Sequence, residues 1–237
     1  MDRNNDDLEI GVASISLRRQ VEEKLRGAIV RGRFAPGEHL SDRTLCEVFK
    51  VSRTVVREAV RQLEAEGLVE TFPHRGSFVR VLTADEAEQI YDVRGVLEAL
   101  AAKKFVQYAT DEQIEKLAKA LNEIKAGLDT DEMDMIGRKQ TFYDVLLSVY
   151  PNTYLRSMLN QILNWSGQLR ATSMSVPGRR RQSVAELERL IEAIRKRDEE
   201  AAWHWSLEHV RNAATAALSV LKERDAKPGD KVVNSKS

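Results

Sequence analysis

The chain has 237 residues, of which 42% are hydrophobic and 31% are charged, a composition that is typical of globular proteins and excludes a wholly disordered chain. Because 37 basic residues balance 37 acidic ones, the net charge points to neither nucleic acid nor membrane. Cys46 is the single cysteine, which excludes an intrachain disulfide. No apolar run approaches the ~20 residues that span a bilayer and the start is not typical of a signal peptide, so we expect a soluble, cytoplasmic protein.

After a disordered start over residues 1–13, two helices are predicted. The first begins after Ser14 or Ser16 and ends at Gly32, and Ser41 caps the second. Apolar spacing predicts which side chains face inward. They are Leu17, Val21, Leu25 and Ile29 in the first helix, and Leu45, Val48 and Phe49 in the second.

A third helix is predicted between Ser52, which caps its start, and Gly67, which ends it in the left-handed conformation. Val56, Val60 and Leu63 recur at helical spacing and form its buried stripe. Arg53, Arg57 and Arg61 are spaced by four residues, so they share the opposite face. By themselves the arginines fit either a solvated face or a surface that contacts a partner.

Two β-rich runs, residues 68–72 and 77–81, flank a basic tip at residues 73–76, which predicts a hairpin. Only a few residues join the second and third helices, the spacing of a helix-turn-helix. Residues 14–82 are therefore predicted to form a winged helix-turn-helix.

Four segments carry a family resemblance: residues 33–41 (RFAPGEHLS), 51–60 (VSRTVVREAV), 63–69 (LEAEGLV) and 75–79 (RGSFV). Together they resemble the N-terminal DNA-binding domain of GntR-family bacterial transcription regulators. The resemblance implies that DNA contacts come from Arg43, Arg53, Thr54 and Arg57, with Ser41 and Ser52 on phosphate and His74, Arg75 and Gly76 as the wing tip in the minor groove. A recognition helix enters the major groove by its N-terminal end, so Arg61 is expected to make no base contact.

Residues 83–223 are predicted to form an all-α bundle of about six helices, followed by a disordered tail over residues 224–237. Capping boxes predict helix starts at Thr83, Thr110 and Ser183. Further helices are expected over residues 131–150 and from near Thr153 to Ser175, with residues 179–181 in a loop. In the first helix of the bundle, the residues expected to face inward are Ile90, Val93, Leu97 and Leu100.

Scattered residues of this half resemble the FCD domain of FadR-type GntR regulators. They lie at 91–94 (YDVR), 97–98, 142, 152, 193–198 (AIRKRD), 201–202 and 209–210 (HV). The resemblance implies a cavity that binds a small organic acid, often through a metal held by an aspartate and three histidines.

The metal ligands of that family are largely replaced in this chain. Its aspartate and two of its histidines fall on Lys139, Tyr143 and Leu187, and only His209 remains. The other histidine of this half, His204, differs from His209 by five positions and points to another side of the helix. We therefore expect no bound transition metal and no other cofactor.

A metal-free site for a small anion is one reading of these replacements. Arg94 and Lys139 would bind a carboxylate, and Tyr143 and His209 would supply hydrogen-bond donors. The other reading places Arg94 and Lys139 in surface ion pairs and Tyr143 in the core. The sequence alone does not separate the two.

The sequence thus predicts a regulator, expected to be a repressor, that binds a pseudo-palindromic operator as a homodimer and responds to a small organic acid. Two alternatives belong to other classes: a helical small-molecule enzyme, and an architectural protein that binds DNA without sequence preference. We find no nucleophile with a paired base and no phosphate-binding glycine loop, so we expect no enzymatic activity.

Overall fold

The computed structural model describes residues 12–128 and 132–226, and the chain divides into two compact units. One comprises Met1–Ile29 with Phe34–Arg80, and the other Val30–Arg33 with Val81–Ser237. Within the described ranges, no helix is both long enough and apolar enough to cross a membrane.

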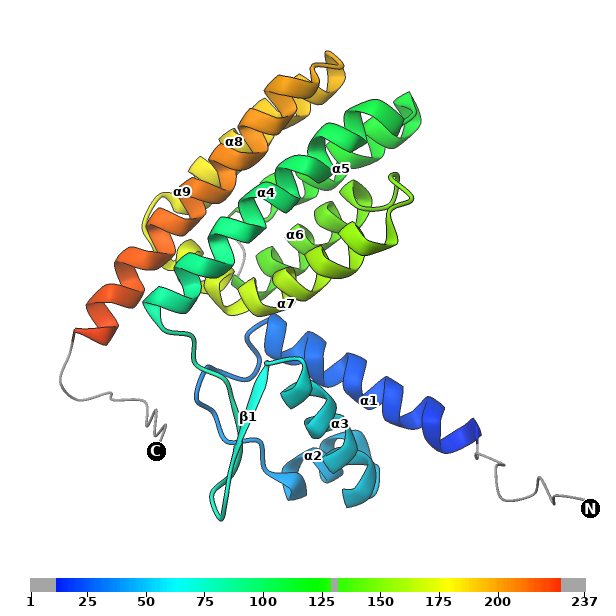
Figure 1. The fold of residues 1–237 in the computed structure, drawn as a ribbon, viewed down its shortest axis with the longest axis vertical. Coiled ribbons are helices and arrows are strands. Elements are labelled where there is room, and N and C mark those ends of the chain that lie inside the picture. The colour runs from blue at the N-terminus through cyan, green and yellow to red at the C-terminus, as the bar shows by residue number, and fades with distance from the viewer. Residues whose placement is uncertain (1–11, 129–131, 227–237) are drawn as a thin grey trace, which may run out of the picture. The chain divides into compact units, whose positions relative to one another are not determined.

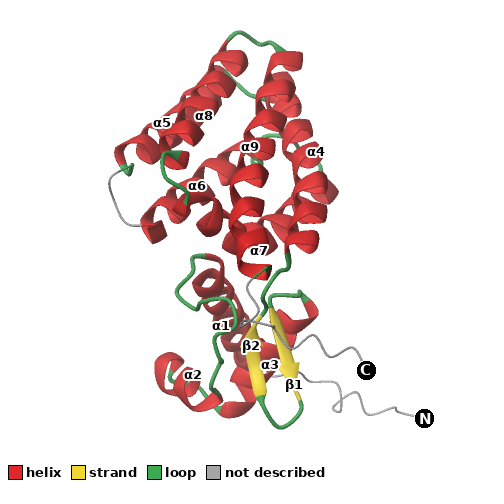
Figure 2. Cartoon of the chain, turned by 90° about the vertical axis from the view of Figure 1, so that its left-hand side faces the viewer, coloured by secondary structure: helices red, strands yellow, loops and turns green. Residues whose placement is uncertain are grey.

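The first unit is a winged helix-turn-helix, as predicted. Its elements are α1 (Val12–Val30), α2 (Asp42–Phe49), α3 (Arg53–Ala65), β1 (Val69–Phe72) and β2 (Gly76–Val79). The two strands pair antiparallel, with Val69 opposite Val79 and Phe72 opposite Gly76, and form the hairpin drawn in yellow in Figure 2.

Local hydrogen bonds fix both ends of α3. At its start Ser52 Oγ accepts a hydrogen bond from the Val55 amide, and Ser41 Oγ does the same for Thr44 at the start of α2. At its end Gly67 has φ +74°, and the amides of Gly67 and Leu68 donate to Glu64 O and Leu63 O. The predicted caps and the glycine stop are confirmed.

The core of this unit confirms most of the predicted apolar faces. Fully buried residues include Val21, Leu25, Ile29, Leu45, Val56, Val60 and Leu63. Two predictions are wrong, because Leu17 is 41% exposed and Val48 is 50% exposed. Leu17 lies near the N-terminal end of α1, where few neighbours cover the helix, and the two-turn helix α2 packs through a narrow stripe around Leu45 that leaves Val48 in solvent.

The second unit is a bundle of six helices within the described residues, in agreement with the predicted class. They are α4 (Ala84–Tyr108), α5 (Asp111–Ala126), α6 (Glu132–Leu146), α7 (Thr153–Ser175), α8 (Arg179–Arg195) and α9 (Glu199–Asp225). The long helices α4 and α9 lie side by side (Figure 1). Capping boxes begin α4 at Thr83 and α5 at Thr110, as predicted.

The predicted start of α8 is wrong. The helix begins at Arg179, directly after Gly178 with φ +80°, so residues 179–181 are helical rather than a loop. Ser183 lies inside the helix and is buried, so it caps nothing. The glycine turn already starts the helix, and Ser183 instead takes part in a buried hydrogen bond.

The inward face of α4 also differs from the prediction. Val93 is 50% exposed, and Ile90, Leu97 and Leu100 are half-buried. The buried positions are Ala84, Ala87, Tyr91, Arg94, Gly95, Glu98, Ala99, Ala101, Ala102, Phe105 and Val106. A face that carries Arg94 and Glu98 thus turns inward, because the two side chains pair with each other and Arg94 also donates a hydrogen bond to Tyr143 of α6.

The terminal and internal boundaries differ slightly from those expected. Residues 12–13 already belong to α1, residues 224–225 belong to α9 and Ala226 caps it, whereas residues 1–11 and 227–237 lie outside the described residues. Residue 131, the expected start of the helix before Pro151, is also outside them, and α6 ends at Leu146.

Candidate functional site

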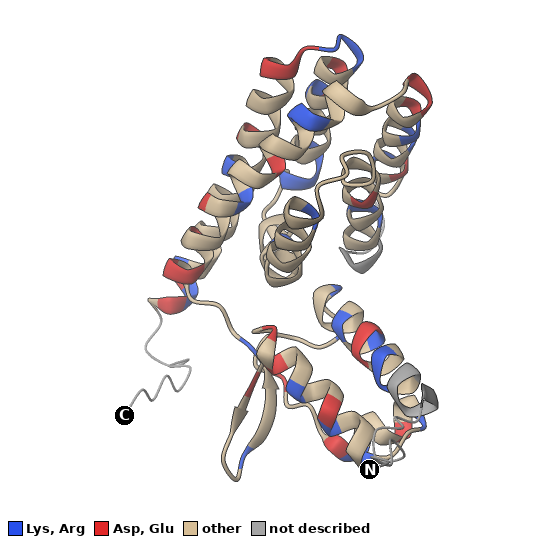
Figure 3. Ribbon diagram, turned by 45° about the vertical axis from the view of Figure 1, so that its right-hand side comes forward, with Lys and Arg blue, Asp and Glu red and all other residues tan. Residues whose placement is uncertain are grey.

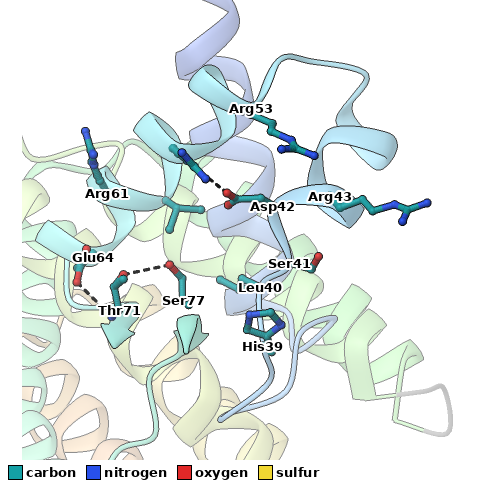
Figure 4. Close-up of a pocket in the computed structure, with 13 residues that line it drawn as sticks. His39, Leu40, Ser41, Asp42, Arg43, Arg53, Arg61, Glu64, Thr71 and Ser77 are labelled. Atoms are coloured by element: carbon teal, nitrogen blue, oxygen red, sulfur yellow. Dashed lines mark hydrogen bonds and ion pairs between the residues drawn. The ribbon is translucent and has the colours of Figure 1, made fainter. Parts of the chain in front are cut away.

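A groove of about 570 Å³ lies between the start of α2, one face of α3 and the hairpin (Figure 4). Its lining includes His39, Ser41, Asp42, Arg43, Arg53, Arg57, Arg61 and Gly76. Lysine and arginine are interspersed with acidic residues along the helices of both units (Figure 3). Four arginines and two acidic residues, Asp42 and Glu64, line the groove, so it carries a local excess of positive charge in a chain with no net charge.

Arg57 is held by Asp42. Its Nε lies 2.8 Å from Asp42 Oδ2, an interaction drawn as a dashed line in Figure 4, while 63% of the Arg57 side chain stays exposed. The hydrogen bond to Asp42 raises the pKa of Arg57 above its ordinary value. Asp42 at the start of α2 thus orients a guanidinium of α3 and leaves most of its surface accessible.

Arg43 and Arg53 are both exposed beside this pair. Arg43 Nε donates to Glu47 at 3.1 Å, a contact on a freely accessible helix surface. Arg61 lines the same groove, although its side chain points away from Arg43 in Figure 4. Thr54 is exposed on α3 but does not line the groove.

The hairpin tip has a constrained backbone. His74 has φ +61° and Gly76 has φ +91°, and a Cβ at Gly76 would come within 2.7 Å of His39 Nε2. The guanidinium carbon of Arg75 lies 5.7 Å from the Phe72 ring centre. His74 and Arg75 are exposed at the tip, the placement expected of a wing.

His39 is a groove residue that the sequence reasoning missed. Its ring packs on Phe78 at 4.9 Å between centres and closes on Gly76. It precedes α2 in an irregular segment, so no periodicity marks it.

The four residues predicted for the ligand site are all buried in the bundle. Arg94 Nη2 donates to Tyr143 OH at 3.1 Å, and Arg94 Nε donates to Glu98 at 2.6 Å. Lys139 Nζ donates to Ser183 Oγ at 2.7 Å. The reading of Arg94 and Lys139 as surface residues is wrong, since they are only 1% and 4% exposed, while Tyr143 belongs to the core cluster.

Four charged residues of this region were not predicted as site residues: Glu98 on α4, Arg170 on α7, and Arg179 and Glu186 on α8. Arg179 Nη2 donates to Glu186 Oε2 at 2.9 Å, and Arg170 Nη2 donates to the Leu163 carbonyl at 2.8 Å. Arg170 is 2% exposed in α7, a helix in which polar and apolar residues are about equally frequent, so the local pattern does not mark this arginine as buried.

Burial governs protonation in this cluster. It lowers the pKa of Lys139 well below its ordinary value, and the positive charges of Arg179, Arg94 and Arg170 lower it further. Burial also lowers the pKa of His209 to about 4, against the opposing effect of the hydrogen bond to Glu186. A neutral His209 therefore donates its Nδ1 proton to Glu186 Oε2 at 2.7 Å, which leaves Nε2 as an acceptor and not the expected donor.

Stability should fall on mild acidification because of His209. The unfolded chain binds a proton there below pH 6.5, whereas the folded chain does so only near pH 4. We expect this group to remove about 2 kcal/mol of unfolding free energy between pH 7 and pH 5. Denaturant unfolding of wild type and His209→Gln at both pH values measures it, and equal pH dependence in the two proteins would contradict the assignment.

The side chains at this site do not fit the metal that the resemblance to FCD domains implies. Lys139, Tyr143 and Leu187 replace its ligands, and Leu187 is 2% exposed in the apolar core. Across the described ranges, no group of three or more histidine, cysteine or acidic side chains is placed to hold a metal ion.

A winged helix-turn-helix with an arginine-lined groove, followed by a helical bundle with a buried charged cluster, defines a two-domain transcriptional regulator. Residues 17–79 match the model for bacterial regulatory proteins of the gntR family, and residues 89–212 match the FCD domain. The chain belongs to the GntR family and carries an FCD domain.

Its relatives are named as regulators. It is 30% identical to the uncharacterized HTH-type transcriptional regulator YdhC of Bacillus subtilis (strain 168), over 86% of this chain and 92% of that protein. It is 29% identical to the transcriptional repressor NanR of Salmonella newport (strain SL254), over 91% and 90% of the two chains. The fold matches the solved structure of E. coli McbR/YncC with a TM-score of 0.77 at 21% identity, over 88% of this chain and 98% of that one.

Proposed function

We propose that this regulator binds a pseudo-palindromic operator as a homodimer, represses transcription there, and is controlled by a small organic anion in its helical domain. It acts without catalysis. The observation that carries the DNA part is the exposed set of arginines around the N-terminal end of α3, with Arg57 oriented by Asp42.

The groove geometry supports base recognition. Arginine pairs bidentately with guanine in the major groove, and each good pair contributes roughly 1–3 kcal/mol of discrimination. Arg53 and Arg57 have the accessible guanidinium groups for such contacts. We assign Arg43, Arg53, Thr54 and Arg57 to base contacts, Ser41 and Ser52 to phosphate, and His74, Arg75 and Gly76 to the minor groove.

Dimerisation and repression rest on different arguments. One winged helix reads one half-site, and two-fold symmetry doubles the contacts on a palindrome. Repression is supported by the name of the NanR relative, which aligns with most of this chain.

The buried cluster supports control by an anion. Arg94, Lys139 and Tyr143 offer positive charge or hydrogen-bond donors away from water. The Nε2 of neutral His209 is an acceptor and adds no donor for a carboxylate. Linkage then requires the anion to bind the DNA-competent and DNA-incompetent states with different affinity.

Selection of bound fragments from genomic DNA, followed by titration of the selected and a random duplex, tests the DNA function. We expect the selected duplex to bind at least about 10³-fold more tightly, and each phosphate contact to add about 0.9 to the slope of log affinity against log salt. Equal affinity for both duplexes would favour the architectural alternative.

A screen of organic acids for release of the selected operator tests the anion function. We expect at least one acid to release the duplex and to be recovered chemically unchanged. Conversion of the acid would favour the enzyme alternative. If every acid left the duplex bound, control of DNA binding by an organic anion would be contradicted.

A further inference from the structure

Four cationic side chains are buried together in the helical unit: Arg94, Lys139, Arg170 and Arg179. We call them the buried cation cluster. They come from α4, α6, α7 and α8 and are 1%, 4%, 2% and 3% exposed. Arg94 pairs with Glu98 and Arg179 with Glu186, so two carboxylates face four basic groups. The cluster carries a formal excess of two positive charges when Lys139 is protonated.

Several nitrogens of this cluster lack partners. Arg94 Nη1, Arg170 Nε and Nη1, and Arg179 Nε and Nη1 are buried and hydrogen-bond to nothing within the described part of the chain. Buried guanidinium groups are normally paired, and an unpaired one lowers stability. Unpaired buried guanidinium groups that lower stability indicate a role other than stabilising the fold. Binding an anion is such a role, because the anion accepts the hydrogen bonds that these nitrogens donate.

The unpaired nitrogens belong to two groups. Arg94 and Arg170 flank one ring, with guanidinium carbons 5.9 Å and 5.6 Å from the centre of Tyr143. Arg179 belongs to the other group, beside Glu186 and His209. Lys139 Nζ donates to Ser183 Oγ, one helical turn from Arg179 on α8, and the charges of all three arginines lower its pKa.

We propose that the buried cation cluster binds one dianion with two separate oxyanion groups, of which a dicarboxylate is the simplest case. Arg94 and Arg170 hold one carboxylate, Arg179 holds the other, and Lys139 lies between them. This inference rests on the proposed control by an organic anion and names the charge class of that anion. It also adds Arg170 and Arg179 to the binding residues.

Arg170 has no carboxylate within hydrogen-bond distance in the described residues. Its contribution to stability can therefore be tested without any ligand. Replacing a surplus buried cation by a neutral side chain of similar shape removes an electrostatic cost. We expect Arg170→Met to raise the Tm of the full chain by about 2–4 °C without ligand. Arg94→Met is the matched control, and it should lower the Tm because Glu98 loses its partner.

The change in Tm shows whether Arg170 is held for a ligand or stabilises the fold. A fall in Tm for Arg170→Met as large as that for Arg94→Met would overturn the inference, since Arg170 would then support the fold.

A second test compares dicarboxylates with their monoamides. Calorimetric titration of the full chain with succinate, glutarate and their monoamides compares ligands of similar shape and different charge. We expect a dicarboxylate to bind at least tenfold more tightly than its monoamide, and Arg179→Gln to abolish that preference. Operator release by a monocarboxylate, with no preference for any dicarboxylate, would overturn the dianion while leaving control by an anion intact.

Discussion

Replacing Arg57 by alanine is expected to weaken operator binding at least about 30-fold, because a symmetric dimer loses one guanidinium at each half-site. Each contact contributes roughly 1–3 kcal/mol, and the two losses add when the half-sites are independent. Arg57 makes its ion pair on an exposed surface, so the substitution removes little folding stability. A fluorescence anisotropy titration with the selected operator measures the change.

Arg61→Ala is the matched control on the same helix. Arg61 is exposed and lines the groove, but it lies farthest from the helix start, so its loss should change operator affinity only a few-fold through general charge. If both variants weakened binding to operator and random duplex equally, Arg57 would contact phosphate rather than a base.

Features determined by neighbouring residues were predictable from the sequence. Ser41 and Ser52 cap helix starts through hydrogen bonds to amides three residues away, and Gly67 ends α3 through its own backbone angle. The apolar stripe of α3 follows for the same reason, because one short helix has one buried face.

Features determined by distant partners were not predictable. Apolar spacing on α4 favours a face through Val93, but the structure turns Arg94 and Glu98 inward, where Tyr143 of α6 receives the guanidinium. Arg170 and Arg179 escaped prediction because their surroundings come from other helices. The residue pattern of one helix does not show that a cation on it is buried by the neighbouring helices.

The start of α8 was also predicted wrongly because of contacts with distant residues. Ser183 and Glu186 have the spacing of a capping box, yet both belong to the buried cluster of an already formed helix. The same spacing of serine and glutamate thus occurs at a helix start and inside a helix. Here Gly178 starts the helix before Ser183, so Ser183 does not cap it.

Replacing Glu186 by alanine is expected to destabilise the helical unit by about 3–5 kcal/mol, because it leaves Arg179 as an uncompensated buried charge. Glu186 accepts hydrogen bonds from Arg179, His209 and Asn212, at 2.9, 2.7 and 2.9 Å. A loss of this size lowers the Tm by roughly 10 °C in a domain of this length. Thermal unfolding followed by circular dichroism measures the shift.

Glu192→Ala on the same helix provides the contrast. Glu192 pairs with Lys196 at 2.6 Å, but both side chains are about two-thirds exposed, at 65% and 68%, so its loss should leave the Tm nearly unchanged. A bound dianion should recover more stability in Glu186→Ala than in wild type, because it replaces the missing negative charge beside Arg179. Similar Tm losses in the two variants would show that Glu186 does not compensate a buried charge.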